Sequence, residues 1–156
     1  MKALLLLADS AQVDDRAKLY ALGLGWSHIG SPTPPIAVVF MIDLEPHEVP
    51  SSLMIQLELR DANGRVAHLP SPTPDEARPF ILRAEMEAKR DEASSGEPIM
   101  VPGVFQIGPG LQLDPGTYTF HLIVGRDLGK DEVEADRSFR VRSAPADGVS
   151  LKTDSR

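Results

Sequence analysis

Alternation with a period of two is the feature that most limits what this chain can fold into. In the stretch LMIQLELR, large apolar side chains occupy every second position: Leu53, Ile55, Leu57 and Leu59. The same alternation recurs in FILRAEMEAK (80–89), in TYTFHLIV (117–124) and around residues 137–142. A strand with one buried face has this period, whereas an amphipathic helix repeats after three or four residues. The pattern therefore predicts β-strands.

Two continuous apolar runs and several turn signals extend this prediction to a fold class. ALLLLA (3–8) and IAVVFMI (36–42) are typical of central strands covered on both faces. Asn63-Gly64 favours a tight hairpin turn, and Gly23-Leu24-Gly25 interrupts any long regular element. We expect an all-β, antiparallel immunoglobulin-like β-sandwich of eight or nine strands in one domain, residues 1–143. The polar residues 144–156 lack periodicity and are expected to form a flexible C-terminal tail.

Charge and composition exclude several classes of partner. The chain has 156 residues and a net charge of −7, with no basic cluster, which argues against nucleic-acid binding. The apolar run before Asp9, residues 3–8, is only six residues long, fewer than a signal peptide usually needs, and no run approaches a membrane span. The absence of cysteine fits a reducing compartment. We therefore expect a cytoplasmic protein that binds neither nucleic acid nor membrane.

No set of residues has the spacing of a known catalytic or metal site. The four histidines are far apart, and no HExxH, HxH or G-x-S-x-G motif occurs. His121 falls on the outward face of its strand, and all four histidines are expected to be solvated or hydrogen-bonded. Glu85 and Glu87 share a strand face, but Arg83 and Lys89 flank them as on an ordinary solvated surface. We expect no catalytic residue, no metal, no cofactor and no enzymatic activity.

The strongest local motif, LQLDPGTYTF, has a structural interpretation. Pro115 favours a turn, and Gly116 is expected to supply a positive φ angle before a strand begins. Tyr118 then enters the core at a sheet corner, where its hydroxyl can bond to the backbone of the turn. This arrangement matches the tyrosine corner of immunoglobulin-like sandwiches.

The stretch KLYALGLGWSHIGSPTPP (18–35) admits two interpretations. In the first, Tyr20 and Trp26 are core residues, with Trp26 closing one end of the sandwich, because exposure of such large rings costs stability. In the second, Trp26, Tyr20 and His28 form a partly exposed platform for a peptide or a sugar ring. We favour the core for both aromatic residues and keep the platform as the alternative.

Two blocks of sequence resemble a family of small uncharacterised bacterial proteins. The first block matches the pattern A-D-x-A-x-V…K-L-Y-x-L-G-x-G-W at these positions: Ala8, Asp9, Ala11, Val13, Lys18, Leu19, Tyr20, Leu22, Gly23, Gly25 and Trp26. The second block is FQIGPGLQLDPGTYTFHLIV (105–124). The resemblance implies a compact β-sandwich of unknown function and carries no catalytic residues.

These observations favour a non-enzymatic binding or accessory module. The main hypothesis is an interaction with another protein through an edge strand or end loops, since edge strands accept added strands. The alternative is a small-ligand or carbohydrate-binding module that uses the Trp26 region. Edge pairing also leaves a homodimer open. The short segment Arg65 to Leu69 and the charged stretch 131–137 are candidates for protecting an edge.

Overall fold

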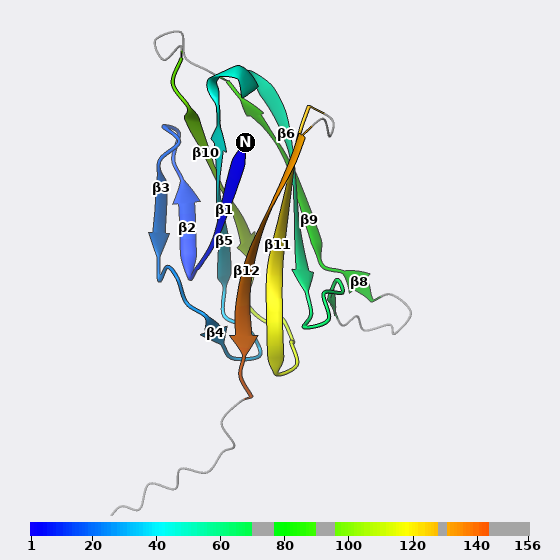
Figure 1. Ribbon diagram of the computed structural model, residues 1–156. Helices are drawn as coiled ribbons and strands as arrows, with labels where there is room; N and C mark the ends of the chain where they lie inside the picture. Colours follow the sequence, from blue (N-terminus) through cyan, green and yellow to red (C-terminus); the bar gives the residue numbers. More distant parts are fainter. Residues whose placement is uncertain (70–76, 90–95, 128–130, 144–156) are drawn as a thin grey trace, which may run out of the picture.

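The computed structural model describes residues 1–69, 77–89, 96–127 and 131–143, which form an all-β structure (Figure 1). The larger sheet has five strands in the order β4 (His28–Ile29), β12 (Asp131–Val141), β11 (Gly116–Arg126), β6 (Ser51–Arg60) and β9 (Ile81–Ala88). The smaller sheet has three strands in the order β1 (Lys2–Ala8), β5 (Ile36–Leu44) and β10 (Ile99–Ile107). The tail expected at 144–156 lies outside the described residues.

The inner faces of the two sheets share one hydrophobic core, so the expected sandwich-like, all-β fold is confirmed. The four alternating residues of β6 that were expected inside are at most 1% exposed: Leu53, Ile55, Leu57 and Leu59. In β11 the same parity buries Phe120, Leu122 and Val124 completely. β6 and β11 pair with each other in antiparallel register, so that Leu57 lies opposite Leu122. The period-two pattern thus sets which face of each central strand is buried.

A hairpin covers part of the outer face of the three-stranded sheet. It consists of β2 (Ser10–Val13) and β3 (Leu19–Leu22), drawn in lighter blue than β1 in Figure 1. Ala11 of the hairpin joins Ala8, Ala37 and Val39 of the sheet in a second buried cluster. This cover explains why residues 36–40 of β5 are all buried although they alternate between two faces.

β1 differs from its expected place. The apolar run ALLLLA predicted a central strand, but among the described residues β1 pairs with β5 alone and ends the three-stranded sheet. The hairpin covers the Ala8 end of β1 and leaves Leu4 48% exposed. An apolar run indicates that other residues pack on both faces of a strand, but it does not indicate how many strands pair with its edges.

The remaining elements are short. Between β5 and β6 lies a 3-10 helix, Pro46–Glu48, and beyond β6 lies a two-residue pair, β7 (His68–Leu69) with β8 (Arg78–Pro79). The described residues contain twelve strands, of which β4, β7 and β8 have two residues each. The charged stretch that begins at Asp131 is part of β12 and pairs along β11, while β4 pairs with Arg140 and Val141 at the other end of β12.

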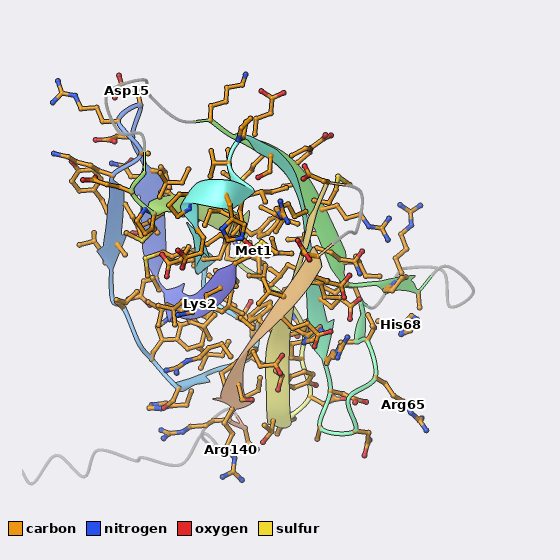
Figure 2. All side chains as sticks on the ribbon, turned by 45° about the horizontal axis from the view of Figure 1, so that its top comes forward. Met1, Lys2, Asp15, Arg65, His68 and Arg140 are labelled. Atoms are coloured by element: carbon orange, nitrogen blue, oxygen red, sulfur yellow. The ribbon has the colours of Figure 1, made fainter. Side chains whose placement is uncertain are left out.

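Two basic side chains labelled in Figure 2, Arg65 and Arg140, lie on different parts of the surface. Arg65 extends from the connection after β6, and Arg140 extends from the far end of β12 (Figure 2). Asp15 lies at the tip of the β2–β3 hairpin, away from both (Figure 2). Within the described part of the chain, no helix has the length and apolar character to cross a membrane.

Candidate functional site

The two long sides of the sandwich are built differently. On one side, β1 of the three-stranded sheet packs beside β12 of the five-stranded sheet. On the other side, β9 and β10 are the last strands of their sheets, and a groove lies between them. We call the side with β9 and β10 the open side, and we call the groove between these strands the β9–β10 groove.

The β9–β10 groove is largely apolar and has a volume of about 420 Å³. Its walls are Ala84 and Met86 of β9 and residues 11–13 of β2, and its floor holds Phe40 and residues 102–106 of β10. Ala84 and Met86 are only partly buried, as is Phe105. A shallow apolar hollow bordered by strand edges can accept the side chains of an extended segment.

Phe40 and Gly103 shape the floor of this groove. They are opposite each other in the pairing of β5 with β10, and a Cβ added at Gly103 would overlap the Phe40 ring. The missing side chain therefore lets the ring lie over the β10 backbone, where it also contacts Phe105 at a centroid distance of 5.6 Å. Glycine in a strand interior often marks such a close approach.

The two strands on the open side offer different backbone edges. Each has a strand partner on one side only among the described residues: β6 for β9 and β5 for β10. The edge of β10 is interrupted by Pro102, which has no N–H to donate. β9 has eight residues and no proline, so its free edge is continuous.

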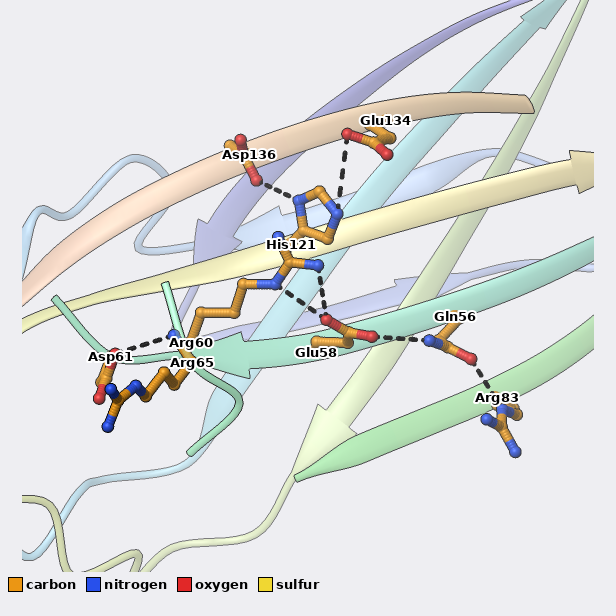
Figure 3. Close-up of polar contacts among 9 residues, drawn as sticks. All are labelled: Gln56, Glu58, Arg60, Asp61, Arg65, Arg83, His121, Glu134 and Asp136. Atoms are coloured by element: carbon orange, nitrogen blue, oxygen red, sulfur yellow. Dashed lines mark hydrogen bonds and ion pairs between the residues drawn. The ribbon is translucent and has the colours of Figure 1, made fainter. Parts of the chain in front are cut away.

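Polar side chains on the outer face of the five-stranded sheet form two bonded groups, one on β12 and β11 and the other on β6 and β9 (Figure 3). We call the two groups together the outer-face network. Its hydrogen-bonded or ion-paired members are Asp136, Glu134, His121, Glu58, Arg60, Gln56 and Arg83. Gln56 joins Glu58 to β9, since its amide nitrogen donates to Glu58 and its carbonyl accepts from Arg83 Nε at 2.8 Å.

His121 was expected on the outward face and is there, but it is only 4% exposed. Its Nδ1 lies 2.6 Å from Asp136 Oδ1, and its Nε2 lies 3.8 Å from Glu134 Oε2. The expectation of a solvated or hydrogen-bonded histidine is therefore confirmed at His121 by the hydrogen bond. Two carboxylate side chains of β12 contact the ring, and alternation along β11 does not reveal this contact.

The chemistry available at His121 is limited by its partners. Both are carboxylates, and no hydroxyl contacts the ring in the described part of the chain. No group of three or more described histidine, aspartate or glutamate residues has the arrangement to hold a metal ion. The hydrogen bonds of the network therefore join β12 to β11 and β6 to β9, and they hold Arg83, a residue of the free edge, at one end.

Glu58 is the buried carboxyl of the network. Burial raises its pKa, but hydrogen bonds from Arg60 and Gln56 and the nearby charges of Arg60 and His121 outweigh this effect. The pKa of Glu58 consequently lies below its ordinary value of 4.5. A carboxyl with a lowered folded-state pKa stabilises the fold above its unfolded pKa, and the contribution disappears as the pH falls through the folded-state pKa.

Substitution of Glu58 by glutamine is expected to reduce the acid sensitivity of the fold. Wild type should lose more unfolding free energy than Glu58→Gln between about pH 5 and about pH 3, because only wild type must protonate this paired carboxylate. Urea denaturation at several pH values measures the difference. Glu132→Gln, at an exposed position on β12, should lose as much unfolding free energy as wild type over the same pH range. Equal losses in wild type and Glu58→Gln would contradict the assignment.

The structure does not bring the candidate ligand residues together in one hollow. Tyr20 lines a depression on the β2–β3 hairpin, whereas His28 lines another hollow with Pro115, Gly116 and Arg140. Trp26 lines neither of them. The hairpin and β4 lie at different heights along the sandwich (Figure 1).

Tyr20 is not a core residue. Its side chain is 51% exposed, and its hydroxyl donates to Asp14 Oδ2 at 3.3 Å. The core prediction failed because the hairpin buries the opposite parity: Leu19 and Ala21 pack on the sheet, and Tyr20 faces solvent. Small residues on the packed face allow the hairpin to approach the sheet closely.

Trp26 is partly buried against the main core. Its ring meets Phe139 edge-on at a centroid distance of 5.7 Å, and its Nε1 is buried without a hydrogen-bond partner among the described residues. Trp26 therefore packs against the core as expected, although it is only partly buried.

Tyr118 lies near the start of β11, where the chain enters the five-stranded sheet. Its ring stacks on Phe139 at 6.0 Å, and the Asp114 backbone hydrogen-bonds its hydroxyl. Burial and the Asp114 carboxylate raise the pKa of Tyr118 above its ordinary value. This is the type of contact that the tyrosine-corner hypothesis requires.

The turn before Tyr118 differs from expectation. Gly116 was expected to adopt a positive φ, but it is the first residue of β11 and does not do so. The positive φ of this connection occurs at Gly110, with φ of 99°. Pro115 precedes the strand in a bend.

Comparison with known proteins finds only weak structural similarity. No protein-family model and no curated protein matches the chain, so the family resemblance stays a prediction. The soluble domain of PmoD from Methylocystis sp. ATCC 49242 (Rockwell) is 16% identical, with 90% of each chain covered and a TM-score of 0.37. A family 123 glycoside hydrolase from Clostridium perfringens is 12% identical, with a TM-score of 0.43. That match covers 92% of this chain but 28% of the hydrolase. Neither similarity bears on function.

Sequence reasoning missed the β9–β10 groove. Its residues belong to four strands, and each strand shows only an ordinary apolar pattern. The one available signal was Gly103 within an apolar stretch, since a glycine inside a strand indicates a close approach by another group.

Proposed function

We propose that this protein is a non-enzymatic binding module that accepts an extended segment of another protein at the open side of its sandwich. The observation that carries the proposal is the β9–β10 groove, an apolar hollow bordered by two strand edges. An added strand would gain backbone hydrogen bonds from an edge and place alternate side chains in the groove. We further propose an immunoglobulin-like topology and a cytoplasmic location, supported respectively by the Tyr118 contact and by the lack of cysteine.

The test is to select peptides from a random library against the folded protein and to map the bound peptide by amide NMR and hydrogen exchange. We expect extended peptides with alternating apolar residues, and we expect amides of β9 or β10 to gain protection. Ala84→Lys places a charge in the groove and should weaken binding at least about tenfold, or about 1.4 kcal/mol.

Ala62→Lys is the matched control, because Ala62 is exposed in the turn after β6. It should bind the selected peptides as wild type does. Circular dichroism checks that both variants fold. Selection of no peptide, or peptide binding that Ala84→Lys leaves unchanged, contradicts the proposal.

The small-ligand alternative centres on the hollow beside β4. Ser27, His28 and Arg140 line this hollow, which has a volume of about 460 Å³ and is richer in polar groups than the β9–β10 groove. A glycan panel would test it with wild type and His28→Ala. Binding that His28→Ala removes supports the alternative, and a panel without binding removes it.

A further inference from the structure

The continuous free edge of β9 carries a charge pattern that fits a second copy of itself. We propose that two copies of this chain pair antiparallel through β9, with Ala84 opposite Ala84 on a two-fold axis. This inference rests on the proposed function, because it names the chain that covers the open side. The argument has three parts: the direction of the backbone groups, the register of the charges and the orientation of the side chains.

The backbone of β9 presents its odd-numbered residues to the free edge. Phe80 O accepts from Leu59 N, so Phe80 directs its carbonyl toward β6. Along an antiparallel strand, the direction of N–H and C=O alternates with each residue. Ile81, Arg83, Glu85 and Glu87 therefore direct their backbone groups away from β6, where a new strand can bind them.

The charges select one register. With Ala84 on the axis, Arg83 of each copy lies opposite Glu85 of the other, and Ile81 lies opposite Glu87. Both Arg83–Glu85 pairs are of the hydrogen-bonded type, and opposite charges at facing positions stabilise a sheet. A closed two-fold dimer requires this self-complementary arrangement.

The two registers that place Glu85 or Met86 on the axis each bring like charges opposite each other. With Met86 on the axis, Glu85 faces Glu87 and Arg83 faces Lys89, which places like charges opposite each other. With Glu85 on the axis, Arg83 faces Glu87, but the two copies of Glu85 face each other at the centre of the pairing. Like charges at facing positions are destabilising.

The two charged side chains are already oriented on the outer face. Gln56 accepts from Arg83 Nε, which leaves the terminal guanidinium nitrogens for a new partner (Figure 3). Ser52 Oγ donates to Glu85 Oε1 at 3.2 Å, which leaves the second carboxylate oxygen. Both side chains are exposed in the single chain.

The opposite face of β9 adds an apolar contact. In the same register, Leu82 of one copy faces Met86 of the other, beside the Ala84 pair. All three side chains are partly buried in the single chain and face the interior side of the sheet. Because Ala84 and Met86 line the β9–β10 groove, the second copy would cover its β9 wall.

Sedimentation equilibrium over a concentration series tests the dimer with a charge exchange. Arg83→Glu and Glu85→Arg each place like charges at both paired positions and should raise the dimer Kd at least about tenfold. The double variant Arg83→Glu/Glu85→Arg restores opposite charges and should return the Kd to within about threefold of wild type. Glu132→Arg, on β12 at the other side of the molecule, should not change it.

A wild-type chain that stays monomeric at all concentrations overturns the proposal, and so does a double variant as weak as the single ones. Peptide selection shows whether a failure concerns the dimer or the proposed binding of other proteins. If the wild-type chain stays monomeric at all concentrations and binds peptides at β9 or β10, the proposed dimer is wrong and the proposed binding module stands. If the dimer follows the charge exchange while no peptide is selected, the proposed capture of other proteins fails instead.

Discussion

Leu122→Ala is expected to lower the free energy of unfolding by about 2–5 kcal/mol, the range for removal of a buried leucine side chain. Leu122 is 0% exposed at the centre of β11, where it faces Leu57 of β6 and Ala135 of β12. The loss combines the transfer free energy of the removed carbons with the cost of the cavity they leave. Strands on both sides are fixed by hydrogen bonds and limit collapse into that cavity.

The matched control is Leu22→Ala, which removes the same atoms from a side chain that is 72% exposed on the β2–β3 hairpin. Its expected effect is within about 0.5 kcal/mol. Urea denaturation monitored by circular dichroism measures both variants. Similar losses for the two leucines would show that the hairpin side chain is packed, contrary to the structure.

Gly103→Ala is expected to destabilise the protein by about 1–3 kcal/mol, the usual cost of overpacking a core. The added Cβ would overlap the Phe40 ring, which is 2% exposed and has little room to move. The same displacement would alter the floor of the β9–β10 groove, so peptide binding should weaken as well. Denaturation and peptide titration on the same samples measure the two effects.

Gly108→Ala is the matched control for this substitution. A Cβ at Gly108 meets nothing within 4 Å, and Gly108 does not have a positive φ. The control should therefore be neutral or slightly stabilising, because alanine restricts the unfolded chain more than glycine does. A Gly103→Ala variant as stable as Gly108→Ala would contradict the close packing of Phe40 on β10.

Alternation predicted the central strands well because each has one face in the core. Leu53 to Leu59 in β6 and Phe120 to Val124 in β11 are buried with the expected parity. It failed for the β2–β3 hairpin, where the packed face carries the smaller residues and Tyr20 faces solvent. A large aromatic residue therefore predicts burial only when its own face of the strand is the one that packs on another surface.

The candidate site was harder to predict, for a physical reason. The β9–β10 groove depends on which strands end the two sheets, and strand order is decided by long-range pairing that local patterns do not encode. The burial of His121 likewise depends on Glu134 and Asp136, which lie on a different strand and reach it only after β11 and β12 pair. The charges of β9 were visible in the sequence, but their position on a free edge was not.

The hairpin over the three-stranded sheet divides the molecule into regions of unequal cooperativity. Ala37 and Val39 are 0% exposed because of this cover, whereas Leu57 and Leu122 are enclosed by both sheets. Detachment of the hairpin would hydrate the first pair and leave the second pair dry. Such partial opening costs less free energy than global unfolding, so the fold contains a local unfolding unit at its N-terminal end. Proteolysis and hydrogen exchange would encounter this unit before the rest of the protein.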